Sequence, residues 1–535
     1  MLNGRDDSIV INFEQLLIEC VVIYLSGSSR FNYLKQYMTT CYKLVLRMLA
    51  ASVVVMPVAA RNHVSEERNN AEYGVENFTP GYEKPLTADS MPAAWTYVPE
   101  NIQSIPGGPA DRWWSAFSDP TLDTLIVMGV RNNYDLRMAA RRREMARAAM
   151  QQAKAAWFPT VGVQAGWVKN QPSGATGESR MVAAPGVSYF QAGLTASWEI
   201  DIFGKIASQV KAERQNYRAS RADFAAAMVS TSAQIASTYF TLREQQRLLQ
   251  VAKAHSESQM EIVKKAQARF DAMIASKLDV AQAWQTYYST TASIPMLEAS
   301  IHQSMTAIGI LTGMWPREAE AMLGQPAPLP NWTPLLPAGI PADLLRRRPD
   351  VVASEMQLAA AAARVGVARK DFLPTLTLEG SAGTEAHSAG DLFGRHSFYW
   401  QVTPTLSWTM FSGFARKYNL VSAREAMQEA IDSYNLTVMN AVGEADNAFN
   451  SYAATLRHID AVQQLCVQNH EALTLAVDRY KNSLSPMTDV VDAQLNALSG
   501  ESELVQSQAS ALLALVQIYE ALGGGVYDSA DNSSK

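Results

Sequence analysis

The chain has 535 residues and a formal net charge of −6, and charged residues make up 18% of it. A nucleic-acid-binding protein would carry a basic domain, so no nucleic acid is expected among its partners. Its three cysteines, Cys20, Cys41 and Cys466, form neither a CxxC motif nor a cluster with histidine. The usual patterns of structural zinc sites and disulfide frameworks are therefore absent from the sequence, and no metal site is expected.

Residues 1–60 have the layout of a presequence. Met38 is the better start, because Lys43 and Arg47 then lead into an apolar run that ends in small residues at Ala60. Basic, apolar and small residues in this order are typical of a secretory signal peptide, and the run is too short to span a membrane as a helix. A buried core helix is the alternative. We predict cleavage near Ala60 and no lipidation, because no cysteine follows the run.

The remaining residues divide into an arm, two copies of one pattern, a connector and a tail. Residues 61–112 are rich in proline and lack periodicity, which indicates an extended arm. The first repeat is predicted at 113–322 and the second at 350–525, with a proline-rich connector at 323–349 between them. Residues 526–535 are polar and predicted to be disordered. Repeats of this size decide the architecture of the whole chain.

Each repeat predicts a helix, two strands, a long helix, a tip and a further helix. The strands are predicted at 160–169, 189–203, 375–384 and 399–411. They alternate apolar and polar residues, which fits both a half-buried soluble sheet and a membrane barrel. Export of the chain and strand lengths of about ten residues favour the barrel. Four strands are too few to close a barrel, so copies of the chain would share one.

A very long helix precedes each tip. No glycine or proline occurs from Lys205 to Ile294, so the part up to the tip would span roughly 100 Å at ~1.5 Å per residue. A column of mostly apolar residues, one at every seventh position, starts at Met228 in the first repeat and at Val438 in the second. A sustained step of seven predicts coiled-coil packing, in which Cys466 takes a buried apolar place.

The two tips are the stretches Arg269–Val280 and Arg479–Val490, which lie 210 positions apart. Both start with an arginine and an aromatic residue and end with Asp-Val. We interpret each stretch as the turn of a long helical hairpin, because a helical pattern precedes and follows it.

One carboxylate lies near the end of the second tip and another just after it. Asp489 and Asp492 are three residues apart, so one helical face can carry both. Asp489 has Asp279 as its counterpart in the first repeat, whereas Asp492 has Gln282. A carboxylate present in both copies suggests a shared local role, and capping of the following helix, with Ser485 as the cap, fits Asp489 as well as gating does.

Three motifs resemble the outer-membrane efflux protein family. The most specific is Leu344-Leu345-x-Arg347-Arg348-Pro349-Asp350, followed by Phe372-Leu373-Pro374. The others are Trp113-Trp114 with Phe117 and Asp119-Pro120, and the stretch Trp198–Gly204. The resemblance runs from about Trp113 to Gly525 and points, within these TolC-like proteins, to the OprM/NodT-type branch that serves proton-driven multidrug pumps. Taken alone, the run Arg346–Arg348 fits an anionic partner less well than a solvated helix start.

The resemblance implies a mixed α/β membrane protein. Four β-strands per chain would join a shared trimeric 12-stranded barrel, and the long coiled-coil helices of the two repeats would form a periplasmic α-barrel. The implied function is the outer-membrane exit duct of a tripartite, RND-type efflux pump, which passively conducts drugs or other toxic compounds from the periplasm to the exterior. Such a duct is not an enzyme and needs no cofactor. The alternative is a periplasmic coiled-coil adaptor or structural protein without a pore, against which the alternating aromatic strands argue.

The implied partners are two further copies in a homotrimer, a periplasmic membrane-fusion adaptor, an inner-membrane RND-type transporter and outer-membrane lipid. The resemblance assigns adaptor docking to the tips, at Ala275, Ser276, Lys277, Leu278, Ser485, Pro486 and Met487. In similar family members, paired tip carboxylates ring the closed pore, which makes Asp492 and Asp489 gate candidates. Asp492 is the better one, because a carboxylate in only one copy has no shared local role. The family usually has glycine in each tip, where this chain has Met273 and Ser483.

Overall fold

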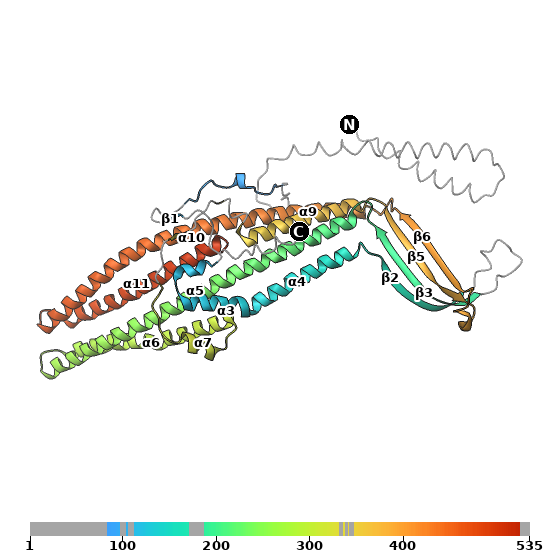
Figure 1. Ribbon diagram of the computed structural model, residues 1–535. Coiled ribbons are helices and arrows are strands. Elements are labelled where there is room, and N and C mark those ends of the chain that lie inside the picture. Colours follow the sequence, from blue (N-terminus) through green and yellow to red (C-terminus); the bar gives the residue numbers. More distant parts are fainter. Residues whose placement is uncertain are drawn as a thin grey trace, which may run out of the picture. The chain divides into compact units, whose positions relative to one another are not determined.

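Figure 1 shows a computed structural model of the chain. It describes residues 83–96, 103–104, 112–170, 187–330, 335–336, 341 and 347–524. The predicted presequence with its cleavage site, most of the predicted arm, part of the connector and the predicted tail lie outside these residues. All described residues belong to the unit that begins at Tyr82.

The two repeats share one series of elements, namely a helix, two strands, a long helix and a further helix, and the first repeat has additional helices before and after this series. The first has η3 (Trp113–Phe117), α3 (Pro120–Asn132), α4 (Tyr134–Ala155), β2 (Thr160–Asn170), β3 (Val187–Ile200), α5 (Lys205–Asp271), α6 (Lys277–Thr312) and α7 (Pro316–Leu323). The second has α9 (Pro349–Lys370), β5 (Thr375–Ala386), β6 (Phe398–Ser407), α10 (Ala415–Lys481) and α11 (Met487–Ala521). Short pieces are η2 (Ala88–Ser90), β1 (Gln103–Ser104), β4 (Leu335–Leu336) and η5 (Ala389–Asp391). Each long helix therefore runs from a strand to a tip.

Local sequence fixes where the first helices begin. The carboxylate of Asp119 accepts a hydrogen bond from the N–H of Thr121 (2.8 Å), and Pro120 suits the first helical position. Asn133 caps α4 in the same way and accepts from the N–H of Leu136 at 3.0 Å. The two caps make α3 and α4 separate helices, so α4 can lead directly into the sheet.

The four strands form one antiparallel sheet in the order β2-β3-β5-β6. Thr160, Ser197, Glu379 and Thr403 lie opposite one another across it and so share its polar face. The other face carries apolar residues that are open to the surroundings, such as Val163, which is 82% exposed. Among the described strands, β2 and β6 are the edges, and each is paired on one side only.

Two strands end earlier than the alternation predicts. β3 ends at Ile200 rather than 203, and β6 ends at Ser407 rather than 411. Pairing explains the shorter β6, because Ser407 lies opposite Thr375, the first residue of β5. Beyond Ser407 the neighbouring strand of the chain offers no further partner.

The long helices separate the sheet from the tips. α5 and α10 contain 67 residues each, which is about 100 Å of helix. Figure 1 shows the sheet at one end of these helices and both tips at the other. α9 packs on both α5 and α10, whereas α4 packs on α5 at the edge of the layer. α9 is long and apolar enough to cross a membrane, but this packing makes it part of the helical body.

The column with a step of seven is buried where the helices pair. Ile235 and Leu242 of α5 are fully buried, and so is Tyr452 of α10. Cys466 is a half-buried free thiol, and burial raises its pKa, which suits a packing role rather than a reactive one.

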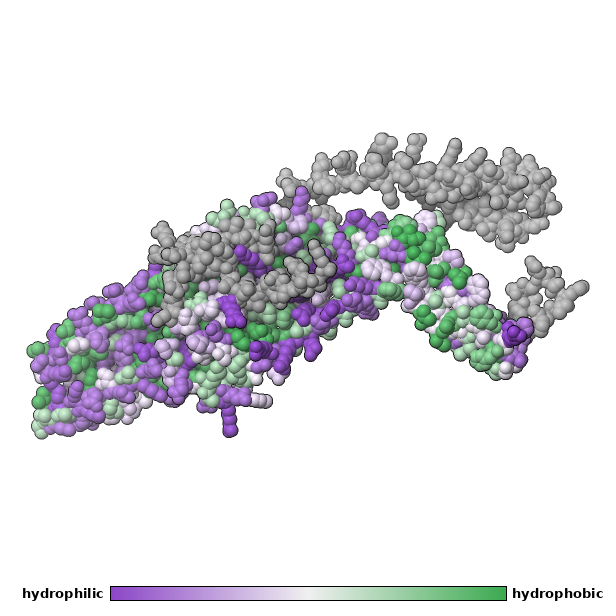
Figure 2. Space-filling view, in the orientation of Figure 1, coloured by the Kyte–Doolittle hydropathy of each residue, from purple (hydrophilic) through white to green (hydrophobic). Residues whose placement is uncertain are grey.

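Hydrophobic surface gathers at the sheet end. On the face drawn in Figure 2, hydrophobic residues cover more of the strands and their junction with the helices than of the hairpins. Exposed large side chains there include Trp400, Trp408, Phe411 and Phe414. Contiguous apolar surface of this kind is suited to lipid or to another chain.

Candidate gate and docking tips

Both tips use the same backbone turn. After α5, the N–H of Ile274 donates to the carbonyl oxygen of Arg269 at 2.9 Å. After α10, the N–H of Leu484 donates to the carbonyl oxygen of Arg479 at the same distance. The internal repeat therefore extends to the hydrogen bonds of the turns.

One residue in each turn adopts the left-handed conformation. Met273 has a φ of 60° and Ser483 a φ of 58°. Glycine adopts this region without the steric penalty that a side chain brings, roughly 1–2 kcal/mol. Both turns therefore hold a residue with a side chain in a conformation that glycine adopts at lower cost.

Arg269 joins the two tips. Its guanidinium donates to the carbonyl oxygen of Lys481 (2.8 Å) and to the hydroxyl of Ser483 (2.7 Å). Its central carbon lies 4.8 Å from the centre of the Tyr480 ring, in a cation–π contact. Burial raises the pKa of Tyr480, and the negative charge of Asp279 adds to this effect. The first hairpin is therefore fastened to the second within one chain.

The helices that leave the tips begin differently. The hydroxyl of Ser276 accepts from the N–H of Asp279 (3.2 Å) and donates to its carboxylate (2.9 Å), which caps α6. α11 begins at Met487 after Pro486, which has no side-chain oxygen to accept from the helix. The Ser485 hydroxyl is buried without a hydrogen-bond partner among the described residues. The expectation that Ser485 caps this helix is therefore wrong.

The two gate candidates lie on the open side of α11. Asp489 and Asp492 are exposed, whereas Val490 and Ala493 are buried against the other helices. Within the described part of the chain, neither carboxylate accepts a hydrogen bond or forms an ion pair. Both are therefore free to meet water, a cation or another copy.

Most of the predicted docking residues are accessible. Leu278 is 63% exposed, Ser276, Lys277 and Pro486 are exposed, and Ala275 and Ser485 are half-buried. Met487 is fully buried in the apolar cluster beneath the tips, so its side chain offers nothing to a partner. Sequence reasoning missed the most exposed apolar residues, Met273 (95%), Leu484 (68%) and Ile274 (63%). Their positions at the apex of each predicted turn could have identified them as exposed.

A groove lies between the two hairpins close to the tips. Its volume is ≈ 300 Å³, and it is lined by Ile262, Lys265, Ala268, Arg269, Val477, Tyr480, Lys481 and Val490. Apolar side chains make up most of this lining, and three basic side chains accompany them. An amphipathic helix with acidic residues along its edge has the matching chemistry.

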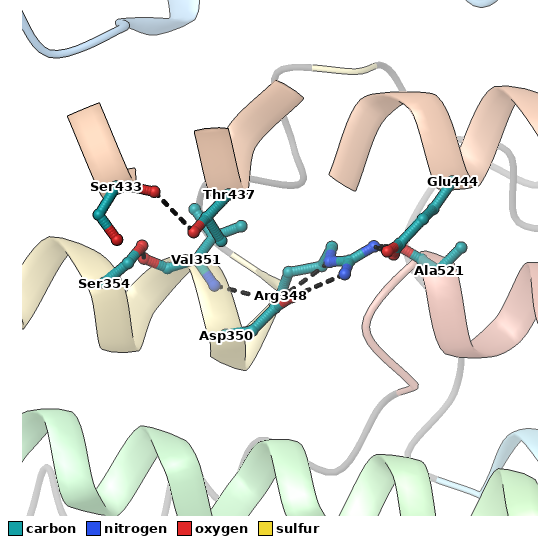
Figure 3. A network of polar contacts seen from close by, with 8 residues as sticks. All are labelled: Arg348, Asp350, Val351, Ser354, Ser433, Thr437, Glu444 and Ala521. Atoms are coloured by element: carbon teal, nitrogen blue, oxygen red, sulfur yellow. Dashed lines mark hydrogen bonds and ion pairs between the residues drawn. The ribbon is translucent and has the colours of Figure 1, made fainter. Parts of the chain in front are cut away.

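Arg348 forms a second arginine site in the body of the molecule, drawn in Figure 3. Its guanidinium pairs with the carboxylates of Asp350 (2.6 Å) and Glu444 (2.8 Å) and donates to the carbonyl oxygen of Ala521 (3.2 Å). Burial opposes the charge of Asp350, but the hydrogen bonds and charge of Arg348 outweigh it and lower the pKa of that carboxyl. Because its donors are used within the chain, Arg348 is a structural residue rather than a site for an anionic partner.

Comparison with known proteins decides the family. The sequence profile described as outer membrane efflux protein matches residues 125–314 and 340–524, which is well over half of the chain. The chain belongs to the outer membrane efflux protein family. The match covers both repeats and the two long hairpins that carry the tips.

Two curated relatives of this efflux protein match most of its length. It is 30% identical over 461 residues to the solvent efflux pump outer membrane protein SrpC of Pseudomonas putida, covering 83% of this chain and 94% of that protein. It is 28% identical over 442 residues to the pyoverdine export outer membrane protein OpmQ of Pseudomonas aeruginosa, covering 82% of this chain and 91% of that protein.

Solved structures show the same fold. The outer-membrane channel OprN superposes on this chain with a TM-score of 0.77 at 30% identity. The match covers 84% of this chain and 99% of the OprN chain. The MtrE outer membrane channel of Neisseria gonorrhoeae, solved in an open state, gives a TM-score of 0.71 at 28% identity, with 84% and 98% covered.

Family membership confirms the predicted identity, localisation and class. The chain is an outer-membrane efflux protein and not an enzyme, and the alternative of a poreless periplasmic adaptor is excluded. The predicted partners, which are further copies, a periplasmic adaptor and an inner-membrane transporter, are those with which this family works. The mostly helical fold with a small antiparallel sheet agrees with the solved channels.

Proposed function

We propose that this chain is one of three subunits that together form the outer-membrane exit duct of an RND-type efflux pump, with four strands from each subunit in one closed 12-stranded barrel. The observation that carries the proposal is the sheet itself, which has an apolar outer face and two edges, β2 and β6, each paired on one side only. Unpaired backbone groups cannot face lipid, and closure of the sheet with further copies removes both edges. The helices below, each about 100 Å long, extend the duct into the periplasm.

Chemical cross-linking in detergent tests the subunit number. The expected ladder stops at three chains, because a head-to-tail contact closes into a ring. A stable monomer inserted in a membrane would contradict the shared barrel.

The transported compounds are toxic molecules that the pump delivers, and the duct conducts them passively. SrpC is named for solvents and OpmQ for pyoverdine, which are very different compounds. Relatives with one fold and such different cargoes support selection by the inner-membrane partner rather than by the duct. Deleting the gene and testing a panel of toxic compounds would identify what this duct exports.

The tips are proposed to dock the periplasmic adaptor. The groove between the hairpins and the exposed apolar apices lie together at the far end from the sheet, and Lys277 is exposed beside them. Lys277→Glu should weaken recovery of the adaptor in a pull-down and reduce efflux. Arg317→Glu, at an exposed position of α7 away from the tips, is the control. Unchanged recovery of the adaptor and unchanged efflux for Lys277→Glu would show that the adaptor does not dock at this surface.

Asp492 and Asp489 are proposed as gate residues at the closed end of the duct. Three copies would bring six carboxylates near one axis, where they repel one another and attract cations. Their exposure and the absence of partners within the described chain support this role. Channel recordings on Asp492→Asn and Asp489→Asn test the two assignments.

A further inference from the structure

The internal repeat allows a comparison of the two places where a strand is followed by a long helix. At the first place, the start of α5 lies against the end of α9, and both belong to one chain. At the equivalent second place, the two sides are the start of α10 and the end of α4, which lie at opposite edges of the molecule in Figure 1. We name the first place the closed joint and the second the open joint.

Polar contacts hold the closed joint. The amino group of Lys370 donates to the carbonyl oxygen of Gly204 (2.8 Å) and to the hydroxyl of Ser208 (2.7 Å). The amino group of Lys205 pairs with the carboxylate of Asp371 at 2.7 Å. Gly204 has a φ of 74°, and a Cβ there would lie 3.2 Å from the amino group of Lys370. The closed joint therefore sets Gly204 and Ser208 of the α5 side against Lys370 of α9, and it pairs Lys205 of α5 with Asp371.

The residues of the open joint differ on both sides at once. In place of Gly204, Lys205 and Ser208, the α10 side has Phe414, Ala415 and Tyr418 at an offset of 210. In place of Lys370 and Asp371, the α4 side has Ala155 and Ala156, at an offset of 215. The same offset relates the Pro-Thr pairs at the starts of β2 and β5. Two of the three α10 positions thus carry aromatic residues in place of glycine and serine, and the charges of Lys205, Lys370 and Asp371 are each replaced by alanine.

The two sides of the open joint are exposed in the single chain. Phe414 is 62% exposed and Tyr418 is 65% exposed, although both are large and apolar in part. Phe414 also has a φ of 66°, a conformation that glycine adopts at the closed joint. Gln151, Ala155 and Ala156 on the α4 side are exposed too. A strained, exposed aromatic residue is retained where surrounding structure over-determines it, and here a second copy would provide that structure.

We propose that Phe414 and Tyr418 of one copy pack on the end of α4 of a second copy, at Gln151, Ala155 and Ala156. The open joint then closes between copies as an aromatic contact directly below the barrel. The inference rests on the proposed trimer and goes beyond it, because it names the residues that hold neighbouring copies together and the chemistry they use.

Strand pairing supports the same contact. Within the chain, Trp198 of β3 lies opposite Leu378 of β5. The repeat-equivalent pair between copies sets Trp408 opposite Val163, with both side chains on the apolar face of the sheet. This pairing supplies a partner for the residues after Ser407, where the alternation continues although β6 of a single chain ends.

Engineered disulfides test the contact. At the closed joint, the Cβ of Ser208 lies 3.8 Å from a Cβ placed on Gly366, which is the mean separation in a disulfide. The equivalent pair between copies is Tyr418 and Gln151. In a chain with no other cysteine, Tyr418→Cys with Gln151→Cys should give covalent dimers and trimers on oxidation. Ser208→Cys with Gly366→Cys is the matched control and should form a bond within one chain that leaves a monomer band.

A second control tests position along α4. Met145 is exposed and lies six residues before Gln151, roughly 9 Å along the helix. Tyr418→Cys with Met145→Cys should give no covalent oligomer. Efficient joining of this pair in place of the Gln151 pair would overturn the proposed contact.

Phe414→Gly separates packing from backbone strain. Glycine relieves the strain at this φ, so a Phe414 that only borders lipid would leave the trimer equally stable or more stable. If Phe414 packs on a second copy, the trimer should dissociate in detergent at a lower temperature. The inference fails if lysine cross-linking still gives trimers while the Tyr418–Gln151 pair joins no chains and Phe414→Gly changes nothing. A complete absence of trimers would instead contradict the proposed function.

Discussion

Two regions of the chain use an arginine to hold helix ends together, and they differ in how completely its donors are satisfied. Arg348 is buried, and two carboxylates and a carbonyl oxygen bind its guanidinium. Arg269 at the tips makes two hydrogen bonds and a ring contact, but its Nε has no partner among the described residues. Exposed Asp489 and Asp492 follow on α11. The body is fixed by a saturated network, whereas the tips are held by contacts that can be exchanged.

The largest effect is expected at the saturated site. Arg348→Ala leaves Asp350 and Glu444 without their cation and frees the carbonyl oxygen of Ala521, and it should lower the free energy of unfolding by about 2 kcal/mol. The value lies below that of a fully buried pair because both carboxylates reach water. Urea unfolding followed by circular dichroism measures it. Arg347→Ala is the control. An equal loss of stability in both variants would show that the contacts of Arg348 add nothing specific to the free energy of unfolding.

A smaller effect on stability and a larger one on opening is expected at the tips. Arg269→Ala removes the bonds to Lys481 and Ser483, worth about 1 kcal/mol at a partly exposed site. Looser tips should raise single-channel conductance in planar bilayers. Lys265→Ala, in the same groove but without a hydrogen bond or ion pair among the described residues, should leave conductance unchanged. Equal conductance for Arg269→Ala and the parent protein would show that this arginine does not hold the tips closed.

The two exposed carboxylates at the tips, Asp489 and Asp492, are expected to differ in their effect on the channel. Asp492→Asn should raise conductance, or weaken block by added divalent cations, more than Asp489→Asn does. The reason is that cations held by the ring of carboxylates bridge the tips, and an amide in place of a carboxylate removes a ligand for those cations. Recordings with and without divalent cations distinguish the two variants. If Asp492→Asn leaves both properties unchanged, its assignment to the gate is wrong.

The smallest effect concerns backbone strain in the turns. Met273→Gly and Ser483→Gly should each raise stability by less than about 1 kcal/mol, because relief of the positive φ is offset in part by the greater freedom of an unfolded glycine. Thermal unfolding checks both variants. Ser483→Gly should gain less, since it also removes the hydroxyl that Arg269 binds. A loss in both variants would show that the turns are not strained.

The sequence alone determined the repeat, the elements and the family. A step of seven and the absence of glycine and proline predict long paired helices, and alternation predicts strands, because both patterns are periodic in the chain. The positions of the tips follow from the offset of 210. Periodic patterns and repeated stretches are properties of the residue order itself, so they can be recognised without a structure.

Only the tertiary structure decided which side chains meet. The sequence gives no hint that Arg269 reaches Lys481 across 212 positions or that Met487 is buried beneath the tips. Capping by Ser485 was a reasonable expectation from local sequence, but α11 begins later, after Pro486. The end of β6 likewise depends on the strand beside it rather than on its own alternation. Such contacts arise when helices and strands far apart in the chain pack together, and no local pattern encodes that packing.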